Sequence, residues 1–424
     1  MDRKVVQIAY GKGRIPLELD PALAQWHVIT PKNEDALTDA HATFVQACRT
    51  PIGSAPLREI IRPKDRVVVV TADGTRPVPN LMLIPWLLEE LPGPRENVTI
   101  LLGTGSHRAN TPDEIEAMFG AEVARRVRVV NHDAFDPAQN TRVGTTASGA
   151  DVLLNNAYVE ADKRIAVGFI EPHFFAGFSG GPKAIAPGVT SIDTLFHLHS
   201  YALLADPNST WGKLDGNPLH ETVAEMVKLC PPDFLVNVTL NLDKHITAFF
   251  VGDYIEAHRA GCARVRDHAM APVPHEFPIV ITSNSGYPLD QNIYQSVKGM
   301  SAASRIVERG GTIFLASACN DGVPAHGNFG AMLREHDTAG AVAAHLRSLS
   351  APVLDQWEVQ VLLQILDKCE VRLYSQIDAE TVRACKLIPV DNLQDAVNAQ
   401  IKAIGTGAPV AVLPEGPLTI PYVT

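Results

Sequence analysis

Short runs of β-branched residues alternate with helix-like segments along most of this chain, and this alternation constrains the fold more than any other feature. It predicts eight strands, at residues 66–70, 98–102, 127–130, 164–168, 234–239, 277–282, 311–316 and 371–374. Between them, residues 80–91 and 111–119 have the apolar spacing of helices. Strands that alternate with helices predict an α/β fold of mainly parallel sheets flanked by helices.

The chain is long enough for two or three domains, with 424 residues. The strand–helix pattern breaks at two prolines near residues 270–275, and a new series begins at Phe277. We therefore predict an N-terminal domain over residues 1–270 and a C-terminal domain over residues 275–407. The Gly/Pro-rich tail, residues 408–424, could return the chain to the N-terminal domain and pack on it.

Charge, cysteine spacing and hydropathy exclude several classes of protein. The formal net charge of −11 argues against a nucleic-acid surface, which needs clustered Lys and Arg, although a small anion needs only a few cations. The six cysteines form no Cys-x-x-Cys pair, so neither a zinc ribbon nor a disulfide scaffold is indicated. The most apolar stretch, residues 81–88, is too short to span a bilayer, and the N-terminus does not resemble a signal peptide. These observations predict a cytoplasmic protein with no membrane or nucleic-acid partner.

Polar clusters follow four of the predicted strands, at residues 73–77, 103–108, 172–187 and 283–298. In α/β proteins, ligands bind at the carboxyl ends of parallel strands. We therefore expect these clusters to meet in one cleft between the two domains and to form the active site of an enzyme.

The segment 171–188 carries the strongest chemical signal. Its glycine-rich stretch, Gly177-Phe-Ser-Gly-Gly181, could turn backbone N–H groups toward an anion, although a turn that serves only backbone geometry stays an alternative. Lys183 follows this stretch, but the next residue is Ala184, so the pattern is not that of a nucleotide-hydrolysing phosphate loop. A lysine in such a place can bind phosphate, form a Schiff base or carry a cofactor covalently.

Three histidines lie in or just after the loops that follow strands, namely His107, His173 and His199. Imidazole titrates near neutral pH and serves as a general base or a metal ligand. His197 lies two residues before His199, and on a helix the two rings would face different directions. We therefore expect only one of that pair in the site.

Two cations are candidates for binding an acidic substrate. Arg76 precedes Pro77, which disfavours helical geometry at the arginine and presents its guanidinium from a turn. A guanidinium held in this way suits bidentate carboxylate binding, and Lys298 could add a second positive charge.

The chain resembles the nickel-dependent lactate racemase family in four motifs that occur in order. They are Asp73-Gly-Thr-Arg-Pro77, Gly103-Thr-Gly-Ser-His-Arg108, Pro172 to Lys183, and Tyr294-Gln-Ser-Val-Lys298. His199 and Asp355-Gln-Trp357 match further elements of the family. The resemblance therefore extends through both predicted domains.

The resemblance implies an isomerase, a racemase or epimerase of a small 2-hydroxy acid such as lactate or malate. The implied reaction is a reversible, proton-coupled hydride transfer. Its cofactor would be a nickel-pincer nucleotide, a pyridinium-3-thioamide-5-thiocarboxylic acid mononucleotide with Ni(II), supplied by separate biosynthetic enzymes. A dicarboxylate substrate would need another cation, which Arg108 or the loop after Cys319 could provide.

The resemblance also implies the role of each residue. Lys183 would carry the cofactor covalently, His199 would complete the nickel coordination, and His107 and His173 would be the two catalytic bases. Further cofactor contacts would come from Asp73, Thr75, Gly177, Ser179, Gly180 and Gly181. Substrate contacts would come from Arg76, Tyr294, Gln295, Lys298 and Trp357.

Two other functions stay open at the level of sequence. One is an enzyme of the pyridoxal phosphate type in which Lys183 forms a Schiff base, but no partner for a pyridine nitrogen is evident. The other is a non-catalytic protein that binds nickel or a nucleotide cofactor. In such a protein Lys183 and His199 would matter, while removal of His107 or His173 would change nothing.

Overall fold

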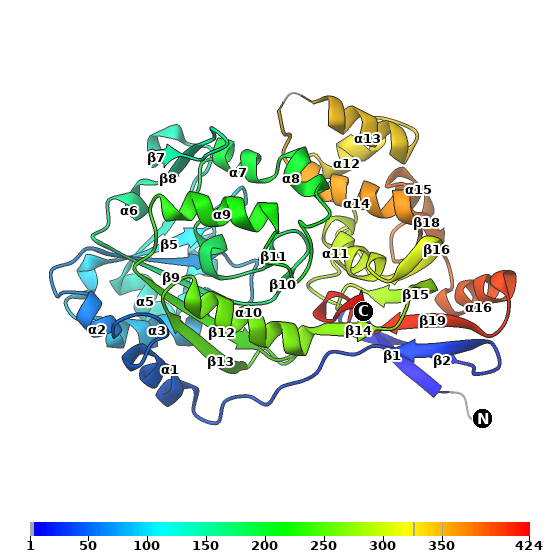
Figure 1. Ribbon diagram of the computed structural model, residues 1–424, viewed down its shortest axis with the longest axis horizontal. Coiled ribbons are helices and arrows are strands. Elements are labelled where there is room, and N and C mark those ends of the chain that lie inside the picture. The colour runs from blue at the N-terminus through cyan, green and yellow to red at the C-terminus, as the bar shows by residue number, and fades with distance from the viewer. Residues whose placement is uncertain (1–3, 325–326, 350) are drawn as a thin grey trace. The chain divides into compact units, whose positions relative to one another are not determined.

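The computed structural model describes residues 4–324, 327–349 and 351–424, and the chain divides into two compact units (Figure 1). The central unit, named for its place in the sequence, comprises residues 33–199 and 206–267. The terminal unit comprises residues 1–32, 200–205 and 268–424. All eight predicted strands and both predicted helices are present, so the predicted α/β fold is confirmed.

A six-stranded sheet forms the middle of the central unit, in the order β13-β12-β9-β4-β5-β6. Its strands are β4 (Val67–Ala72), β5 (Val98–Gly103), β6 (Arg128–Asn131), β9 (Lys163–Phe169), β12 (Phe234–Leu240) and β13 (Ile246–Gly252). Every pairing is parallel except that of β12 with β13. The consecutive valines 67–70 are all buried, as expected for a parallel sheet covered on both faces.

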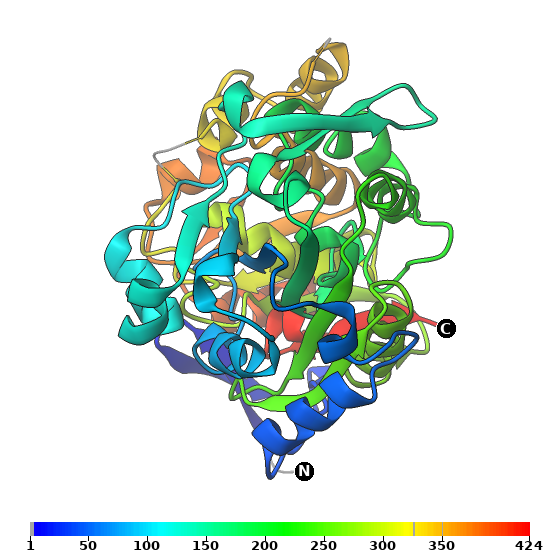
Figure 2. The same ribbon diagram turned by 90° about the vertical axis from the view of Figure 1, so that its left-hand side faces the viewer.

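Helices cover this sheet, and Figure 2 shows them on both of its sides. One core cluster joins the sheet to α1 (Ala40–Arg49), α2 (Leu57–Ile60), α3 (Asn80–Glu90), α4 (Pro112–Phe119) and α5 (Ala121–Arg126). The helix predicted over residues 111–119 is present as α4, and in the structure Thr111 and Glu114 form a capping box at its start. The short helix α6 (Asn156–Val159) and the 3-10 turn η3 (Gly181–Ala184) also contact β4.

The terminal unit contains a second six-stranded sheet, in the order β18-β17-β16-β15-β19-β3, and all of its pairings are parallel. Its strands are β3 (Ala24–Val28), β15 (Phe277–Ser283), β16 (Val307–Ala316), β17 (Glu370–Tyr374), β18 (Ile388–Val390) and β19 (Ala408–Leu413). The hairpin of β1 (Lys4–Tyr10) and β2 (Gly13–Leu19) shares one core with α16 (Leu393–Ile404). Two further helices, α11 (Ile293–Ser304) and α14 (Gln356–Lys368), contact β16.

The structure divides the chain differently from the predicted domains 1–270 and 275–407 in two respects. Residues 1–32 belong to the terminal unit, where β3 forms an edge of the sheet beside β19. The tail 408–424 also lies in that unit, because β19 pairs with β15 and β20 (Ile420–Val423) pairs with β14 (Met270–Val273). The physical reason is hydrogen bonding, since β19 between two strands has partners for its N–H and C=O groups on both sides. The chain leaves the central unit at Asp267, close to the predicted break.

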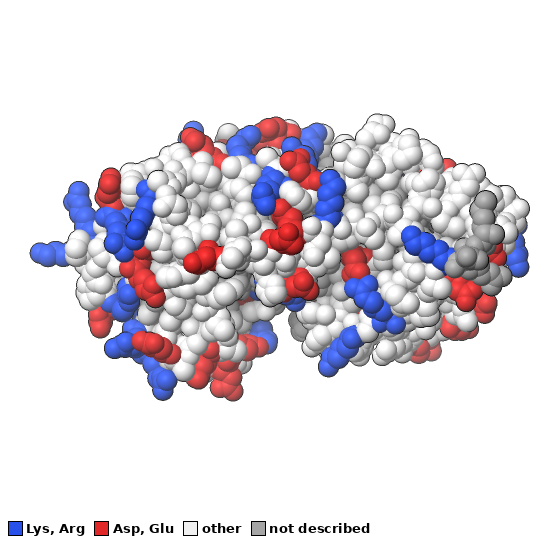
Figure 3. Space-filling model, turned by 90° about the horizontal axis from the view of Figure 1, so that it is seen from below, with Lys and Arg blue, Asp and Glu red and all other residues white. Residues whose placement is uncertain are grey.

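Charged side chains of both signs are interspersed over the face shown in Figure 3. Among the helices of the described residues, none combines the length and the apolar character needed to cross a membrane.

Candidate active site

Three of the predicted polar clusters adjoin one another in the central unit. The guanidinium of Arg76 lies 3.7 Å from the carboxylate of Glu171, which links the loop after β4 to the segment after β9. The N–H of Gly105 donates to the carbonyl of Gly188 at 3.0 Å, which links the loop after β5 to the same segment. The sheet order explains this arrangement, because β4 lies between β5 and β9 and all three strands are parallel.

His107 is held by a buried carboxylate. Its Nδ1 lies 2.8 Å from Oδ2 of Asp73, and an ionised carboxylate can only accept, so Nδ1 donates. The neutral ring then has its lone pair on Nε2, and the side chain is 52% exposed. Burial alone would raise the pKa of Asp73, but hydrogen bonds from His107 and Thr75 and the charge of Arg76 outweigh burial and lower it. Asp73 thus orients the imidazole of His107 in the way that the aspartate of a Ser-His-Asp triad orients its histidine.

Thr75 supports the same carboxylate. Its hydroxyl donates to Oδ1 of Asp73 at 2.6 Å, and its N–H donates to the same atom at 3.2 Å. Asp73 and Thr75 were predicted to bind the cofactor, and that assignment stays a prediction. The hydrogen bonds present in the structure give them a positioning role toward His107.

His173 has a buried environment built from backbone and aromatic rings. It lies in β10 (Pro172–His173), opposite Gly177 of β11 (Gly177–Phe178). The N–H groups of Phe175 and Ala176 point at its Nδ1 at 3.5 and 3.3 Å, and the ring of Phe175 lies 4.5 Å from its own. Because Nδ1 accepts these contacts, the neutral ring has its hydrogen on Nε2.

Lys183 and His199 influence each other electrostatically. Lys183 lies in η3, and His199 forms the C-cap of α7 (Ile192–Leu198). Burial, opposed by the hydrogen bond to Leu195 and reinforced by the charge of Lys183, lowers the pKa of His199 to about 4. Nδ1 of His199 donates to the carbonyl of Leu195 at 2.9 Å, so a neutral ring has its lone pair on Nε2. Neutral imidazole is the form that binds metals.

His197 and His199 have different surroundings, as expected from their spacing. Nε2 of His197 lies 3.4 Å from the hydroxyl of Ser148. The ring of His199 is buried, and it lies edge-on to Phe175 at 5.6 Å, the same ring that contacts His173. Of the two, His199 is the one beside the candidate site.

The glycine-rich loop uses much of its hydrogen-bonding capacity on the protein itself. The N–H of Ser179 donates to the carbonyl of Glu171 at 2.9 Å, and the Ser179 hydroxyl donates to Phe169 at 2.9 Å. The N–H of Gly181 donates to the side chain of Asn237 at 2.8 Å. These two N–H groups hold the loop in place, so they do not support the expected anion cradle.

Steric requirements explain the glycines of this loop. Gly177 has φ +79°, and a Cβ there would lie 2.0 Å from the carbonyl oxygen of Lys213. Gly180 has φ +73°, and its Cβ would lie 2.6 Å from Oδ1 of Asn237. Positive φ and close backbone approach both favour glycine. The alternative of a turn that serves backbone geometry therefore accounts for these two positions.

Sequence reasoning missed two residues that hold the glycine-rich loop by hydrogen bonds, Asn237 and His258. The side chain of Asn237, within β12, accepts from Gly181, and Nε2 of His258 donates to the carbonyl of Ser179 at 2.9 Å. Burial lowers the pKa of His258 to about 4. The sequence contains one signal for Asn237, since a polar residue inside a buried strand needs a partner. It contains none for His258.

The terminal unit brings together the substrate residues predicted in its part of the chain. The indole N–H of Trp357 on α14 donates to the hydroxyl of Tyr294 on α11 at 3.0 Å. The amine of Lys298 donates to Oε1 of Gln295 at 2.7 Å, one turn apart on α11. Their assignment to substrate binding, and the location of the site in a cleft between domains, stay predictions.

Arg108 has a carboxylate partner in its own loop region. Its guanidinium makes two hydrogen bonds to Glu114, at 2.8 and 2.6 Å. Glu114 also belongs to the capping box of α4. The cation suggested for a second substrate carboxylate is therefore already engaged with an acid.

Comparisons with known proteins agree with the predicted resemblance. The family model "Lactate racemase N-terminal domain" matches residues 10–212, and "Lactate racemase C-terminal domain" matches residues 274–420. The lactate racemase of Thermoanaerobacterium thermosaccharolyticum is 34% identical over 416 residues, which are 97% of each chain. The lactate racemase of Lactiplantibacillus plantarum is 34% identical over 381 residues, 88% of this chain and 89% of that one.

Solved structures give the same result. The lactate racemase apoprotein of T. thermosaccharolyticum matches with a TM-score of 0.92 and 33% identity, over 99% of this chain and 100% of that one. A protein of Thermotoga maritima matches with a TM-score of 0.67 and 18% identity, over 92% of this chain and 100% of that one. The second likeness concerns the fold alone.

Proposed function

This chain belongs to the lactate racemase family, and from that membership we propose that it interconverts the two enantiomers of lactate. It is an isomerase of the racemase type. The observation that supports the proposal best is the orientation of His107, whose Nδ1 is engaged by buried Asp73 so that Nε2 can accept a proton. A second imidazole, His173, lies in the adjoining segment.

The proposed reaction begins with the substrate carboxylate. Arg76, presented from the turn after β4, binds it by charge-assisted hydrogen bonds. Nε2 of His107 accepts the hydroxyl proton of one enantiomer as the carbon atom becomes planar. His173 serves the hydroxyl of the other enantiomer, which points in a different direction. To accept that proton at Nε2, its ring hydrogen must move to Nδ1, which requires the long contacts from the N–H groups of Phe175 and Ala176 to be given up. Arg76 retains the carboxylate throughout, so that only the reacting carbon reorients.

Direct removal of the α-proton is difficult, because it would leave a carbanion beside a carboxylate, so a hydride acceptor would provide an easier route. When bound, a nickel-pincer nucleotide supplies a reversible hydride acceptor. The donor set fits such a group, since Lys183 offers an amine for covalent attachment and neutral His199 offers an imidazole ligand suited to Ni(II). We propose that these two residues hold it, and that separate biosynthetic enzymes supply it.

The decisive experiment uses protein produced together with the enzymes that make the pincer cofactor. Intact mass spectrometry first establishes an adduct on Lys183, and chiral chromatography then follows pure L-lactate. We expect a racemic mixture from the wild type and none from Lys183→Ala. A loaded protein that leaves lactate unchanged would refute the proposed substrate, and an unmodified Lys183 would refute the proposed attachment.

Deuterium at the α-carbon tests the proposed chemistry independently. Hydride transfer retains deuterium when [2-²H]lactate is racemised in ordinary water. Direct deprotonation exchanges it with solvent and would contradict the mechanism. The same assay with malate tests whether a second substrate carboxylate is accepted.

A further inference from the structure

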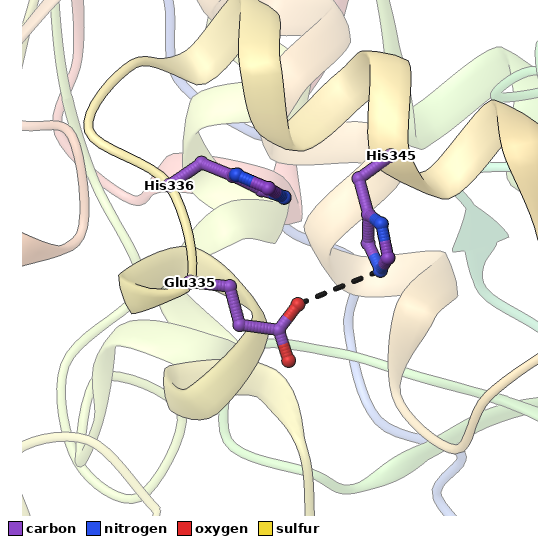
Figure 4. Close-up of side chains that lie close together, drawn as sticks. All are labelled: Glu335, His336 and His345. Atoms are coloured by element: carbon purple, nitrogen blue, oxygen red, sulfur yellow. Dashed lines mark ion pairs between the residues drawn. The ribbon is translucent and has the colours of Figure 1, made fainter.

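Three potential metal ligands lie close together in the terminal unit, on elements that the proposed reaction does not use. They are Glu335, His336 and His345 (Figure 4). Glu335 is the C-cap of α12 (Phe329–Arg334), His336 follows it, and His345 lies on α13 (Ala339–Ser348). The cluster therefore joins the end of one helix to the last turn of the next.

The distances are close to those of a metal site. Nε2 of His345 lies 3.5 Å from Oε2 of Glu335, and one ligand atom from each of the three residues lies within 4.8 Å of the others. A tetrahedral zinc ion, with bonds of about 2.0 Å, holds its ligands about 3.3 Å apart. Two of the three ligands already have nearly that separation, and a small side-chain rotation, of about 1.5 Å at most, would bring in the third.

His336 supplies an independent observation. Its Nε2 is buried and has no hydrogen-bond partner among the described residues. Buried polar atoms in proteins nearly always have a partner, and each exception needs an explanation. A metal ion bound by that nitrogen provides one.

An ordinary ion pair on the same chain provides the contrast. His41 and Glu89 lie 3.4 Å apart, almost the same distance as His345 and Glu335. Within the described part of the chain, the pair at residues 41 and 89 does not belong to any group of three metal-ligand side chains, whereas the pair at 335 and 345 does. The third ligand separates a candidate metal site from a simple surface ion pair.

We propose that Glu335, His336 and His345 bind a divalent transition-metal ion of the zinc class. Two imidazoles and one carboxylate suit Zn²⁺ and its neighbours, whereas Mg²⁺ and Ca²⁺ prefer oxygen ligands. Three protein ligands leave a position for water. The bound ion fixes the turn between α12 and α13, and it is separate from the nickel that His199 is proposed to bind.

Zinc binding is best tested in a chain that also carries His199→Ala, which removes the proposed nickel ligand of the active site. Isothermal titration with Zn²⁺ alone should show one site on the metal-free protein. His336→Ala and His345→Ala should each weaken it at least tenfold, and Glu335→Gln should weaken it less. The matched control, His41→Ala, should bind zinc as the parent does, and Mg²⁺ should not compete.

Thermal melting distinguishes loss of a ligand from loss of the fold. In the presence of EDTA we expect every variant to melt close to the parent. When zinc is instead added to metal-free protein without EDTA, the melting temperature of the parent and of His41→Ala should rise, and that of His345→Ala should not. If an alanine variant fails to fold, Glu335→Gln and His345→Gln replace it in the titration. A parent that binds no zinc, or zinc affinity that survives loss of both histidines, would overturn the proposal.

Discussion

The loop after β5 and the segment after β9 each present one predicted catalytic histidine, and they hold it in opposite ways. His107 is about half exposed and is oriented by the charged side chain of Asp73. His173 is buried and is surrounded by backbone N–H groups and the ring of Phe175. In their neutral forms the two rings consequently have their hydrogen on different nitrogens. Changes near His107 should therefore affect activity without affecting stability, whereas changes near His173 should affect stability as well.

The largest effect is expected from Asp73→Asn. The amide can donate to Nδ1 of His107, which forces the ring hydrogen onto Nε2 and removes the base. We expect kcat to fall by about 10² to 10⁴, equivalent to roughly 3–5 kcal/mol in the barrier, with little loss of stability. Steady-state kinetics on cofactor-loaded protein measures the effect, and Glu114→Gln is the control carboxylate. Loss of the cofactor together with activity would instead support the predicted cofactor-binding role of Asp73.

The next largest effect is the loss of unfolding free energy when one methyl group is added at Gly177, in the segment after β9. Gly177→Ala puts a Cβ 2.0 Å from the carbonyl of Lys213 at φ +79°, and should cost at least about 3 kcal/mol of unfolding free energy. Gly105→Ala, in the loop of His107, has φ +54° but no atom nearer than 3.6 Å, and should cost about 1 kcal/mol. Denaturant titration compares the two, and equal costs would contradict the difference in packing.

Low pH should destabilise the segment after β9 through His258, which is hydrogen-bonded to the Ser179 carbonyl of that segment. Burial lowers the pKa of this ring from 6.5 to about 4, so the unfolded chain binds the proton first. The stabilisation is present above pH 6.5 and is lost as the pH falls toward 4, by roughly 2 kcal/mol between pH 7.5 and 5. His258→Gln keeps a donor for Ser179 and should reduce this pH dependence, measured by denaturant titration of the metal-free protein. Retention of the full pH dependence in His258→Gln would contradict the assignment to this ring.

The smallest effect concerns Thr75, whose hydroxyl donates to Asp73. Thr75→Val removes this hydrogen bond and leaves the one from the Thr75 N–H, a change of about 1 kcal/mol. We expect kcat to fall by roughly threefold to tenfold, with cofactor content unchanged. A variant that loses the cofactor would show that Thr75 binds it, as the resemblance implies.

Most of the fold and part of the site could be predicted from the sequence. The eight strands are evident because β-branched runs favour extended backbone whatever their partners. The helix α4 is evident because the apolar residues of 111–119 have helical spacing. The positions of His107 and His173 after β5 and β9 are evident because a parallel strand that ends in a polar loop presents its side chains at one edge of the sheet, while their catalytic roles stay predictions.

The order of the strands and the hydrogen bonds of the glycine-rich loop could not be predicted, because they depend on contacts between residues far apart in the chain. Only the fold places β19 between β15 and β3, because a strand joins whichever edge completes its hydrogen bonds. Likewise, only the fold pairs Gly181 with Asn237, which are 56 residues apart.

Local composition thus determined which elements form and which chemical groups stand at their ends. The tertiary structure alone decided how those groups are engaged. The hydrogen bond to Asp73 orients His107. The N–H groups of Ser179 and Gly181 bind acceptors within the protein, because buried polar groups form hydrogen bonds with whichever partners the fold brings near.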